Sequence, residues 1–270
     1  MLSKTYSTAK KFLIRSIPSD DAKSILESYL ELPDKSNDPV PINEIYKRLL
    51  RSAQNANMKA NVIGGSIGGF ENFSKALFSF NPCKVEKNYA NNPNELLNHI
   101  EKTLKPKGEI RRLPQSIWPK YCNTILSSAA FLRQFKNGED FYEWANYLYG
   151  DPRSMAALPM ILSSEIEGIG YPLACDFLKE LGFINYGKPD VHIIEIFVGI
   201  GLCKSDAKPY HIQKIISQIA SAAKVSSYNV DKLFWLIGSG KFYDHPKLGK
   251  GGLIGQNKVQ FIAEFNLQKK

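Results

Sequence analysis

The sequence lacks several features that mark common classes of protein. No run of apolar residues in the 270-residue chain approaches the roughly 20 that cross a bilayer, so we expect no membrane-spanning helix and no membrane partner. The four cysteines are widely spaced, and no two of them form a C-x-x-C pair. This spacing argues against a zinc ribbon and against a clustered iron–sulfur loop, and reduced thiols in the cytoplasm fit it best.

Signatures of metal sites and of phosphate loops are also missing. None of the four histidines has ligand spacing with a pair of cysteines, so we expect no metal ion and no other cofactor. The glycine cluster over residues 64–69 lacks the Lys-Ser/Thr pair of a Walker loop, and no predicted strand precedes it. We expect a flexible connection there, before a helix near Phe70 whose N-terminus is an alternative site for a phosphate.

Acidic residues are absent from the first part of the chain. The segment from Met1 to Pro18 carries four basic residues and no acid, a composition shared by mitochondrial transit peptides. The alternative, which we favour, is a basic first helix or a frayed tail. We therefore expect a cytoplasmic protein, with organellar targeting as the minor alternative.

Basic residues, in contrast, are in excess over the whole chain. The formal charge of +9 and the pI near 9.2 indicate a polyanionic partner, because lysine and arginine at phosphates release condensed counterions. A merely basic soluble protein is the alternative. The hydrophobic fraction of 43% is ordinary for a globular protein, and the length is sufficient for one large helical domain.

Apolar residues recur at helical spacing along nearly the whole chain, without a convincing strand pair or internal repeat. The spacing predicts helices over residues 22–30, 42–53, 93–104, 117–135, 141–148, 156–163, 172–181, 191–201, 208–223 and 228–238. We therefore predict an all-α protein that forms a single unit over residues 1–270. Residues 1–40 are expected to be an N-terminal extension and loop, with the loop over residues 33–41.

The most informative segment covers about residues 164–202. It contains Gly168-Ile169-Gly170 between two predicted helices, and two glycines around an aliphatic residue favour a tight turn. Consecutive backbone N–H groups at such a turn, together with the N-terminal dipole of the next helix, suit a phosphate oxygen. Ile169 would point inward and lock the two helices together. Taken alone, this motif is a weak signal, because ordinary helix–helix turns share it.

A second motif follows after the glycine that ends the second helix, Gly182. Its aspartate, Asp190, starts a new apolar helix and would be an ordinary N-cap if it stood alone. In residues and spacing, the two motifs together resemble the helix-hairpin-helix DNA glycosylase superfamily (HhH-GPD). The resemblance covers about 40 residues and rests on Ile166-Glu167-Gly168-Ile169-Gly170 and Pro189-Asp190-Val191-His192-Ile193.

The resemblance implies a fold, a reaction and a site. The fold would be the all-α, two-lobed HhH-GPD glycosylase-like fold with a central DNA-binding cleft, in a monomer that acts on double-stranded DNA. The enzyme would flip a damaged or mispaired base and hydrolyse its N-glycosidic bond in base excision repair. Asp190 would be the catalytic carboxylate, stabilising oxocarbenium-like charge on the sugar. The expected DNA-binding residues are Gly168, Ile169, Gly170, Tyr171, Lys188 and His192.

One departure from the family pattern concerns the mechanism. Family members that also cleave the DNA backbone carry a Schiff-base lysine two residues after the second glycine, where this chain has Pro172. The resemblance therefore implies a monofunctional glycosylase, without AP lyase activity and without an iron–sulfur cluster. Lys188 and Lys179 are the nearest alternative amines. Lys188 is the better stand-in of the two, although for this residue we favour a phosphate contact or a solvated charge.

Several weaker candidates remain. Trp118 and Trp235 are candidates for the wall of a base pocket, although aromatic residues at helical spacing are usually core. The hairpin could hold a monovalent cation through backbone carbonyls. A basic stretch near the C-terminus is either a DNA contact or, as we favour, a solvated tail; its lysines are Lys241, Lys247, Lys250 and Lys258.

Two alternatives compete with a nucleoid-associated enzyme. One is a non-catalytic helix-hairpin-helix protein that keeps the hairpin for sequence-independent phosphate contact. The other is an all-α interaction scaffold with coincidental motifs, which would bind no DNA and show no salt dependence. Asp190 distinguishes the enzyme from the first alternative, because DNA binding alone needs no buried carboxylate.

Overall fold

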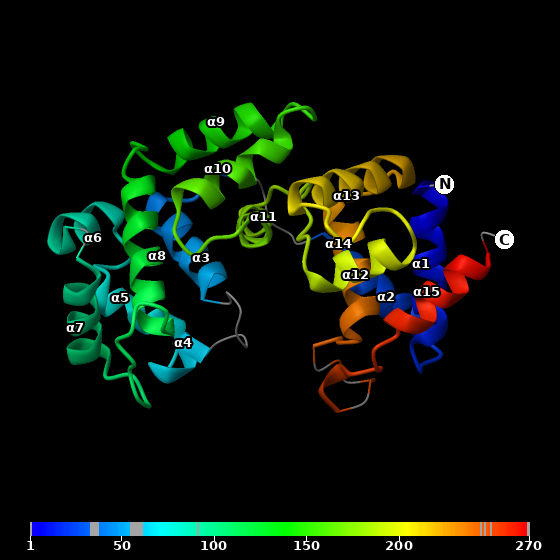
Figure 1. Cartoon of the computed structure of the whole chain (residues 1–270), viewed down its shortest axis with the longest axis horizontal. Coiled ribbons are helices and arrows are strands. Elements are labelled where there is room, and N and C mark those ends of the chain that lie inside the picture. Colours follow the sequence, from blue (N-terminus) through cyan, green and yellow to red (C-terminus); the bar gives the residue numbers. More distant parts are fainter. Residues whose placement is uncertain are drawn as a thin grey trace. The chain divides into compact units, whose positions relative to one another are not determined.

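The computed structural model describes residues 2–32, 38–54, 62–90, 92–243, 245, 247–248 and 250–268 (Figure 1). Within these ranges the chain is helical, and the one extended pairing is an isolated bridge between Lys241 and Leu253. The chain divides into two compact units. Unit 1 comprises residues 1–36 and 182–270, and unit 2 comprises residues 37–181. The predicted all-α fold is confirmed, while the central cleft stays a prediction.

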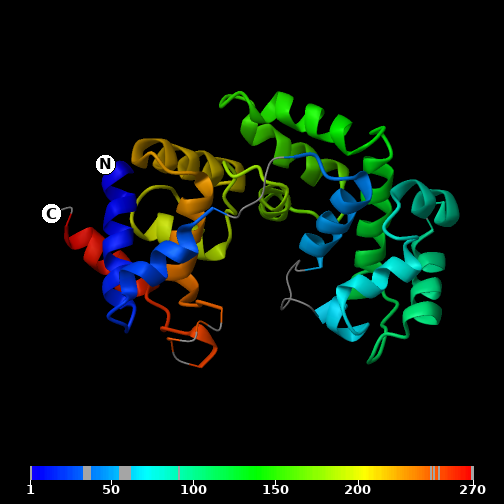
Figure 2. The ribbon, with the colours of Figure 1, turned by 180° about the vertical axis from the view of Figure 1, so that it is seen from behind.

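Unit 1 brings the two ends of the chain together. In Figures 1 and 2 the blue N-terminal helices lie among the yellow to red helices of the last third. Helix α1 packs on α13, α14 and α15, and α2 packs on α14. The helices of unit 1 are α1 (Leu2–Ser16), α2 (Ala22–Leu30), α12 (Val191–Gly199), α13 (Pro209–Ala223), α14 (Ser227–Ser239) and α15 (Lys258–Leu267), with a 3-10 turn η3 (Lys250–Gly252).

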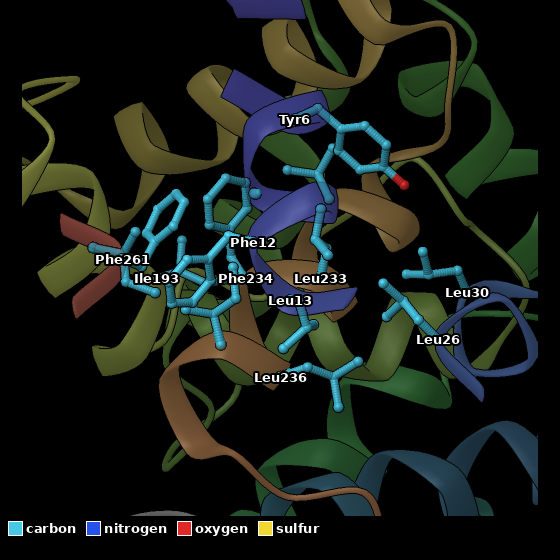
Figure 3. Close-up of a cluster of buried hydrophobic side chains, with 14 of the residues drawn as sticks. Tyr6, Phe12, Leu13, Leu26, Leu30, Ile193, Leu233, Phe234, Leu236 and Phe261 are labelled. Carbon is cyan, nitrogen blue, oxygen red and sulfur yellow. The ribbon is translucent and has the colours of Figure 1, made fainter. Parts of the chain in front are cut away.

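The core of unit 1 is built around the apolar faces of α1 and α14 (Figure 3). Phe12 of α1 contacts Phe261 of α15 edge-on, with ring centroids 5.2 Å apart, and Phe234 of α14 contacts Phe197 of α12 at the same separation. Each buried side chain of this size contributes roughly 1.5–3 kcal/mol relative to an exposed one. The residues expected as an N-terminal extension therefore form a structural part of unit 1, because Tyr6, Ala9, Phe12 and Leu13 are all buried.

Unit 2 is organised around α8 (Ile117–Leu132), which packs on α3, α6 and α7. Two buried tyrosines tie α3 to α8: Tyr46 donates to the carbonyl of Ile125 at 2.7 Å, and Tyr121 donates to the carbonyl of Leu50 at 2.9 Å. The other helices are α3 (Ile42–Ala53), α4 (Val62–Ser66), α5 (Phe73–Ala76), α6 (Pro82–Tyr89), α7 (Pro93–Leu104), α9 (Gly138–Tyr149), α10 (Leu158–Glu165) and α11 (Tyr171–Glu180), with 3-10 turns η1 (Phe70–Asn72) and η2 (Met155–Ala157).

Two local expectations differ from the structure. The glycine cluster is not a flexible connection, since Gly64 and Gly65 lie within α4, and Gly64 donates its N–H to Oε1 of Gln54 at 3.2 Å. The basic C-terminal stretch is not a solvated tail, because Lys247 pairs with Asp21 and Lys258 pairs with Glu195. Residues 33–37 of the expected loop lie outside the described residues.

None of the described helices is both long and apolar enough to cross a bilayer.

Candidate active site

The hairpin of unit 2 has the geometry that its glycines predict. Ile169 is buried, whereas Gly168 and Gly170 are exposed. Among the described residues, the N–H groups of Gly168 and Gly170 donate no hydrogen bond. Gly170 is the N-cap of α11 and has no side chain to cap it, and the first turn of α11 contains no acidic residue, so its positive dipole end is not capped by its own residues.

Gly168 is required at its position for two reasons. Its φ of +79° lies in the left-handed region that disfavours other residues. A Cβ atom there would also lie 2.3 Å from Oγ1 of Thr124 on α8. The backbone N–H of Glu167 donates to Oγ of Ser127, one turn further along α8, at 3.1 Å. Helix α8 therefore fixes the hairpin from within unit 2.

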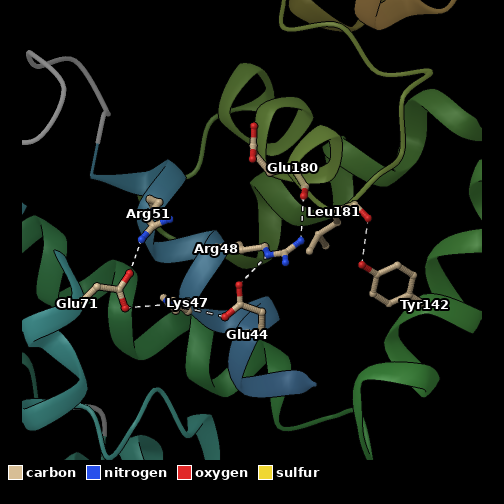
Figure 4. A network of polar contacts seen from close by, with 8 residues as sticks. All are labelled: Glu44, Lys47, Arg48, Arg51, Glu71, Tyr142, Glu180 and Leu181. Carbon is tan, nitrogen blue, oxygen red and sulfur yellow. Dashed lines mark hydrogen bonds and ion pairs between the residues drawn. The ribbon is translucent and has the colours of Figure 1, made fainter. Parts of the chain in front are cut away.

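The far end of α11 is held by polar side chains (Figure 4). Arg48 donates to the carbonyl of Glu180 at 3.0 Å, and Tyr142 donates to the carbonyl of Leu181 at 3.0 Å. These two donors satisfy carbonyls that a helix end leaves without an intrahelical partner. The side chain of Tyr171, at the other end of α11, is buried and donates to the carbonyl of Ala156 at 2.9 Å. Only the backbone of Tyr171 is thus placed to contact a phosphate.

Asp190 lies in unit 1, at the start of α12. It is the N-cap of this helix, and its Oδ1 accepts the N–H of Ile193 at 3.1 Å. The backbone N–H of Asp190 donates to the carbonyl of Lys188 at 2.8 Å. The expected capping geometry is therefore present, and it fixes the orientation of the carboxylate.

The surroundings of Asp190 change how readily it is protonated. Burial raises the pKa of Asp190 above its ordinary value, and the nearby charge of Asp231 raises this pKa further. The N–H of Ile193 and the charges of His192 and Lys188 act in the opposite direction. Burial outweighs the cap, so this carboxylate takes up a proton more readily than an exposed aspartate.

Two buried polar residues that the sequence analysis missed hold the loop before Asp190. Gln213 of α13 accepts the N–H of Gly187 at 3.0 Å and donates to the carbonyl of Asn185 at 3.1 Å. Asp231 of α14 accepts the N–H of Lys188 at 3.0 Å. Both side chains are buried. Both residues lie on the apolar face of a predicted helix, which could have identified them: a polar side chain at such a position needs a specific partner once it is buried.

His192 packs closely against α14. A Cβ atom on Gly238 would lie 2.6 Å from Cβ of His192, so only glycine leaves room for the ring. The Nδ1 atom of His192 is buried, and no hydrogen-bond partner for it exists among the described residues. The structure therefore places His192 beside Asp190 within unit 1, while its expected contact with DNA stays a prediction.

The two candidate amines have different surroundings. Lys188 is partly buried and lies in the same loop as Asp190, where its charge acts on that carboxylate. Lys179 lies on α11 in unit 2, where its Nζ pairs with Asp176 at 3.2 Å. Only Lys188 thus shares a unit with Asp190.

The two candidate tryptophans belong to different units. Trp235 lies one helical turn after Asp231 on α14, and its ring stacks on Tyr243 with centroids 5.3 Å apart and an interplanar angle of 10°. Nζ of Lys232 lies over both rings. Trp118 is buried in unit 2 and borders a cavity of about 620 Å³ whose lining includes Lys107 and Arg111. Of the two candidate tryptophans, only Trp235 therefore shares a unit with Asp190.

Within the described residues, no group of three or more histidine, cysteine or acidic side chains is placed to hold a metal ion. The four cysteines form no disulfide. Burial raises the pKa of the Cys122 thiol to about 12, which makes it unreactive near neutral pH. The expectation of no cofactor, and that of a monovalent cation at the hairpin, stay predictions.

One relative in sequence is the "8-oxoguanine DNA glycosylase/AP lyase" of Korarchaeum cryptofilum (strain OPF8), which is 28% identical to this chain over 86 residues. The aligned part is 30% of this chain and only 41% of that protein. No protein-family model matches the chain.

Two solved structures are similar, both from Methanocaldococcus jannaschii. That of the 8-oxoguanine DNA glycosylase has a TM-score of 0.50 at 17% identity, covering 89% of this chain and 98% of that chain. The second structure is the 8-oxoguanine glycosylase/lyase in complex with 15mer DNA containing 8-oxoguanine. It has a TM-score of 0.48 at 20% identity and covers 85% of this chain and 98% of that chain. At such low identities the first likeness shows the fold, and nothing more follows from the second.

The comparisons correct one expectation and confirm another. The prediction that this chain lacks AP lyase activity is contradicted, because the relative in sequence is named as a glycosylase/AP lyase. Pro172 excludes an amine at one position only, and other lysines are available to supply it. The comparisons support the predicted resemblance to the helix-hairpin-helix DNA glycosylases, because one relative in sequence is named a DNA glycosylase and one solved glycosylase structure shares the fold.

Proposed function

We propose that this chain is a DNA glycosylase that takes a damaged base out of a duplex and breaks its bond to deoxyribose. The observation that carries the proposal is Asp190, a largely buried carboxylate fixed as the N-cap of α12 in a motif that resembles the family's catalytic segment. A structural N-cap needs no burial and no second carboxylate nearby. Asp190 has both.

The chemistry of Asp190 follows from its fixed position. Cleavage of a base–deoxyribose bond develops positive charge at the anomeric carbon, as in glycoside hydrolysis. The ionised carboxylate stabilises that charge, and its orientation costs no reorganisation because the N–H of Ile193 already holds it. The base must first leave the stack. Trp235, on the helix that faces the Asp190 loop, is the proposed wall for the flipped base.

Binding to the duplex would use the hairpin and the loop of Lys188. The exposed N–H groups of Gly168 and Gly170, with the dipole of α11, would hold one phosphate. Lys188 and His192 would contact the DNA beside the target nucleotide. Together these contacts fix the register of the protein on DNA without reading its sequence. We place this activity in the cytoplasm, on the nucleoid.

For the substrate, we propose 8-oxoguanine, the base named for the relative in sequence. That relative is also named an AP lyase, and we propose that this chain carries a lyase step with Lys188 as the amine. The neutral amine would attack the anomeric carbon as the base leaves. Loss of the amine proton and opening of the bond between that carbon and the ring oxygen, which takes up a proton, would give an iminium, and loss of a proton from C2′ would then expel the 3′ phosphate. In this proposal Asp190, whose pKa is raised, accepts the proton that the amine must lose.

The experiment that tests the function uses a panel of duplexes, each with one damaged or mispaired base. The protein is incubated with each duplex, and strand breaks are scored before and after hot alkali. We expect breaks on the 8-oxoguanine duplex. Tight, salt-sensitive binding without breaks on any duplex would instead support the non-catalytic helix-hairpin-helix protein, and no binding at all would support a scaffold.

Gly170→Ala and Gly168→Ala are expected to separate DNA binding from folding. Gly170 has a φ of −78°, and a Cβ atom added there would come no closer than 3.8 Å to another residue's heavy atom. Gly170→Ala should therefore fold normally. Its methyl group would keep a phosphate from the exposed N–H, and affinity should fall roughly tenfold on any duplex. Because no charge is lost, the salt dependence should stay the same.

Gly168→Ala should instead destabilise the protein by about 2 kcal/mol or more, because of its positive φ and the clash with Thr124. Fluorescence anisotropy on an undamaged duplex and thermal unfolding measure the two effects. Normal affinity in Gly170→Ala would remove the hairpin from the proposed DNA contact.

Base excision is expected to fall as the pH is lowered, and to fall earlier than an ordinary aspartate would require. The ionised form of Asp190 is the active one, and burial together with Asp231 raises its pKa. Protonation therefore begins at a higher pH than for an exposed aspartate, and activity is lost as the pH falls through this raised pKa. Single-turnover excision rates, measured from neutral to acidic pH, give the pH at which activity is lost. A rate that stays level down to the ordinary pKa of aspartate would contradict this expectation.

A further inference from the structure

Asp231 is a buried carboxylate to which the proposed reaction assigns no task. It lies on α14 with 4% of its surface exposed. Burying a charge in this way is costly unless the charge makes specific contacts. One contact is the N–H of Lys188, which Oδ2 of Asp231 accepts at 3.0 Å.

This contact leads directly to Asp190 through the backbone. The N–H of Lys188 is held by Asp231, and the carbonyl of Lys188 accepts the N–H of Asp190 at 2.8 Å. The carboxylate of Asp190 in turn accepts the N–H of Ile193. A displacement of Lys188 would therefore move the start of α12 and the carboxylate with it.

The loop approaches α13 and α14 so closely that it has little room to move. A Cβ atom on Gly187 would lie 2.8 Å from Cγ2 of Ile216 and 3.1 Å from Cβ of Asp231. The N–H of Gly187 is also accepted by the buried side chain of Gln213. The consecutive N–H groups of Gly187 and Lys188 are thus held by side chains of two different helices, Gln213 of α13 and Asp231 of α14.

The charges around Asp190 come from three segments. Lys188 in the loop and His192 on α12 favour the ionised form of Asp190, whereas Asp231 on α14 disfavours it. Helix α15, which also packs on α12, brings Lys258 to Glu195, further along α12. Asp231 is therefore the one acidic side chain among the groups that act on Asp190 in the described part of the chain.

We propose that Asp231 is a positioning residue for Asp190: it holds the loop that carries Asp190, through the N–H of Lys188, and places a second negative charge beside it. The proposal rests on the proposed function insofar as Asp190 is catalytic. Asp231 acts on the reaction only through Asp190. It would set the lowest pH at which the enzyme works and the precision with which the carboxylate faces the sugar.

The test follows the titration of Asp190 itself, by the carboxyl carbon signal that is missing in Asp190→Asn. In Asp231→Asn the side-chain oxygen still accepts the N–H of Lys188, but the charge is gone. We expect the titration of Asp190 to shift to lower pH in this variant. The control is Asp206→Asn, which removes the same charge from an exposed site of unit 1 and should leave the titration unchanged. An unshifted titration in Asp231→Asn would overturn the proposal.

The anchoring role is read from amide hydrogen exchange at Lys188. Exchange should be slow in the unmodified protein and in Asp231→Asn, and about tenfold faster in Asp231→Ala, which has no acceptor. If Asp231→Ala does not fold, the comparison is made with Asp231→Leu. Equal exchange in all folded variants would overturn the anchor.

Excision rates measured on the same samples separate this proposal from the proposed function. If Asp231→Asn shifts the titration of Asp190 and the acid limb of excision together, both stand. If the titration shifts but no duplex is cut by any variant, the positioning role stands and the glycosylase proposal fails.

Discussion

Asp190→Asn is expected to reduce base excision by at least about 100-fold while the protein still folds and binds DNA. Asparagine is as good an N-cap as aspartate, so its side chain can still accept the N–H of Ile193 and start α12. The variant loses only the negative charge that stabilises the developing oxocarbenium. Loss of one fixed electrostatic group of this kind typically costs a factor of 10² to 10³ in rate.

Single-turnover excision and thermal unfolding are the measurements for this variant. Asp206→Asn, an exposed carboxylate of the same unit, is the matched control and should excise at the normal rate. A normal rate in Asp190→Asn would show that the aspartate is a structural N-cap and nothing else. If Asp190→Asn loses both excision and folding, the test is repeated with Asp190→Ser, because serine is also a good N-cap and carries no charge.

Lys188→Arg is expected to abolish the covalent adduct that borohydride traps between enzyme and DNA. Arginine keeps the positive charge beside Asp190 but has no amine that can form an iminium. Excision itself should continue with water as the nucleophile, giving breaks only after alkali. The expected result is thus a change from spontaneous to alkali-dependent strand scission.

Lys179→Arg is the matched variant for the second candidate amine. It keeps the charge that pairs with Asp176 and should leave trapping unchanged. If the adduct persists in Lys188→Arg and disappears in Lys179→Arg, the amine lies on α11 and our assignment is wrong. If neither variant loses the adduct, another amine of the chain forms it.

Much of the fold follows from the sequence because its helices are amphipathic. The ten helices predicted from apolar spacing are all present. Pro93 starts α7, as proline in a first turn predicts, and Gly182 follows the end of α11, as glycine after a helix predicts. The short helices α4 and α6 and the C-terminal helix α15 were missed. Helix α15 buries Phe261 and Phe265 within a stretch whose lysines suggested a solvated tail. Apolar residues in a basic segment give only a weak periodic signal, and it is packing against the rest of unit 1 that makes this segment a helix.

The site was only partly visible in the sequence. The hairpin glycines and Asp190 were identified because turn geometry and helix capping are local properties. Asp231 and Gln213 were missed, since their partners lie 43 and 26 residues away along the chain. The raised pKa of Asp190 also depends on burial and on Asp231, which no local motif reveals. Pro172 led to a wrong conclusion about lyase activity, because absence of an amine at one position says nothing about lysines elsewhere.

The most direct test of the central claim is the detection of a free base. A duplex with one 8-oxoguanine is incubated with the protein and with Asp190→Asn, and the released small molecules are identified by mass spectrometry. We predict free 8-oxoguanine, in one-to-one amount with the total strand breaks scored after alkali, from the unmodified protein and almost none from Asp190→Asn. Equal release by both proteins would contradict the assignment of Asp190 as the catalytic carboxylate, and no release by either would contradict excision of this base.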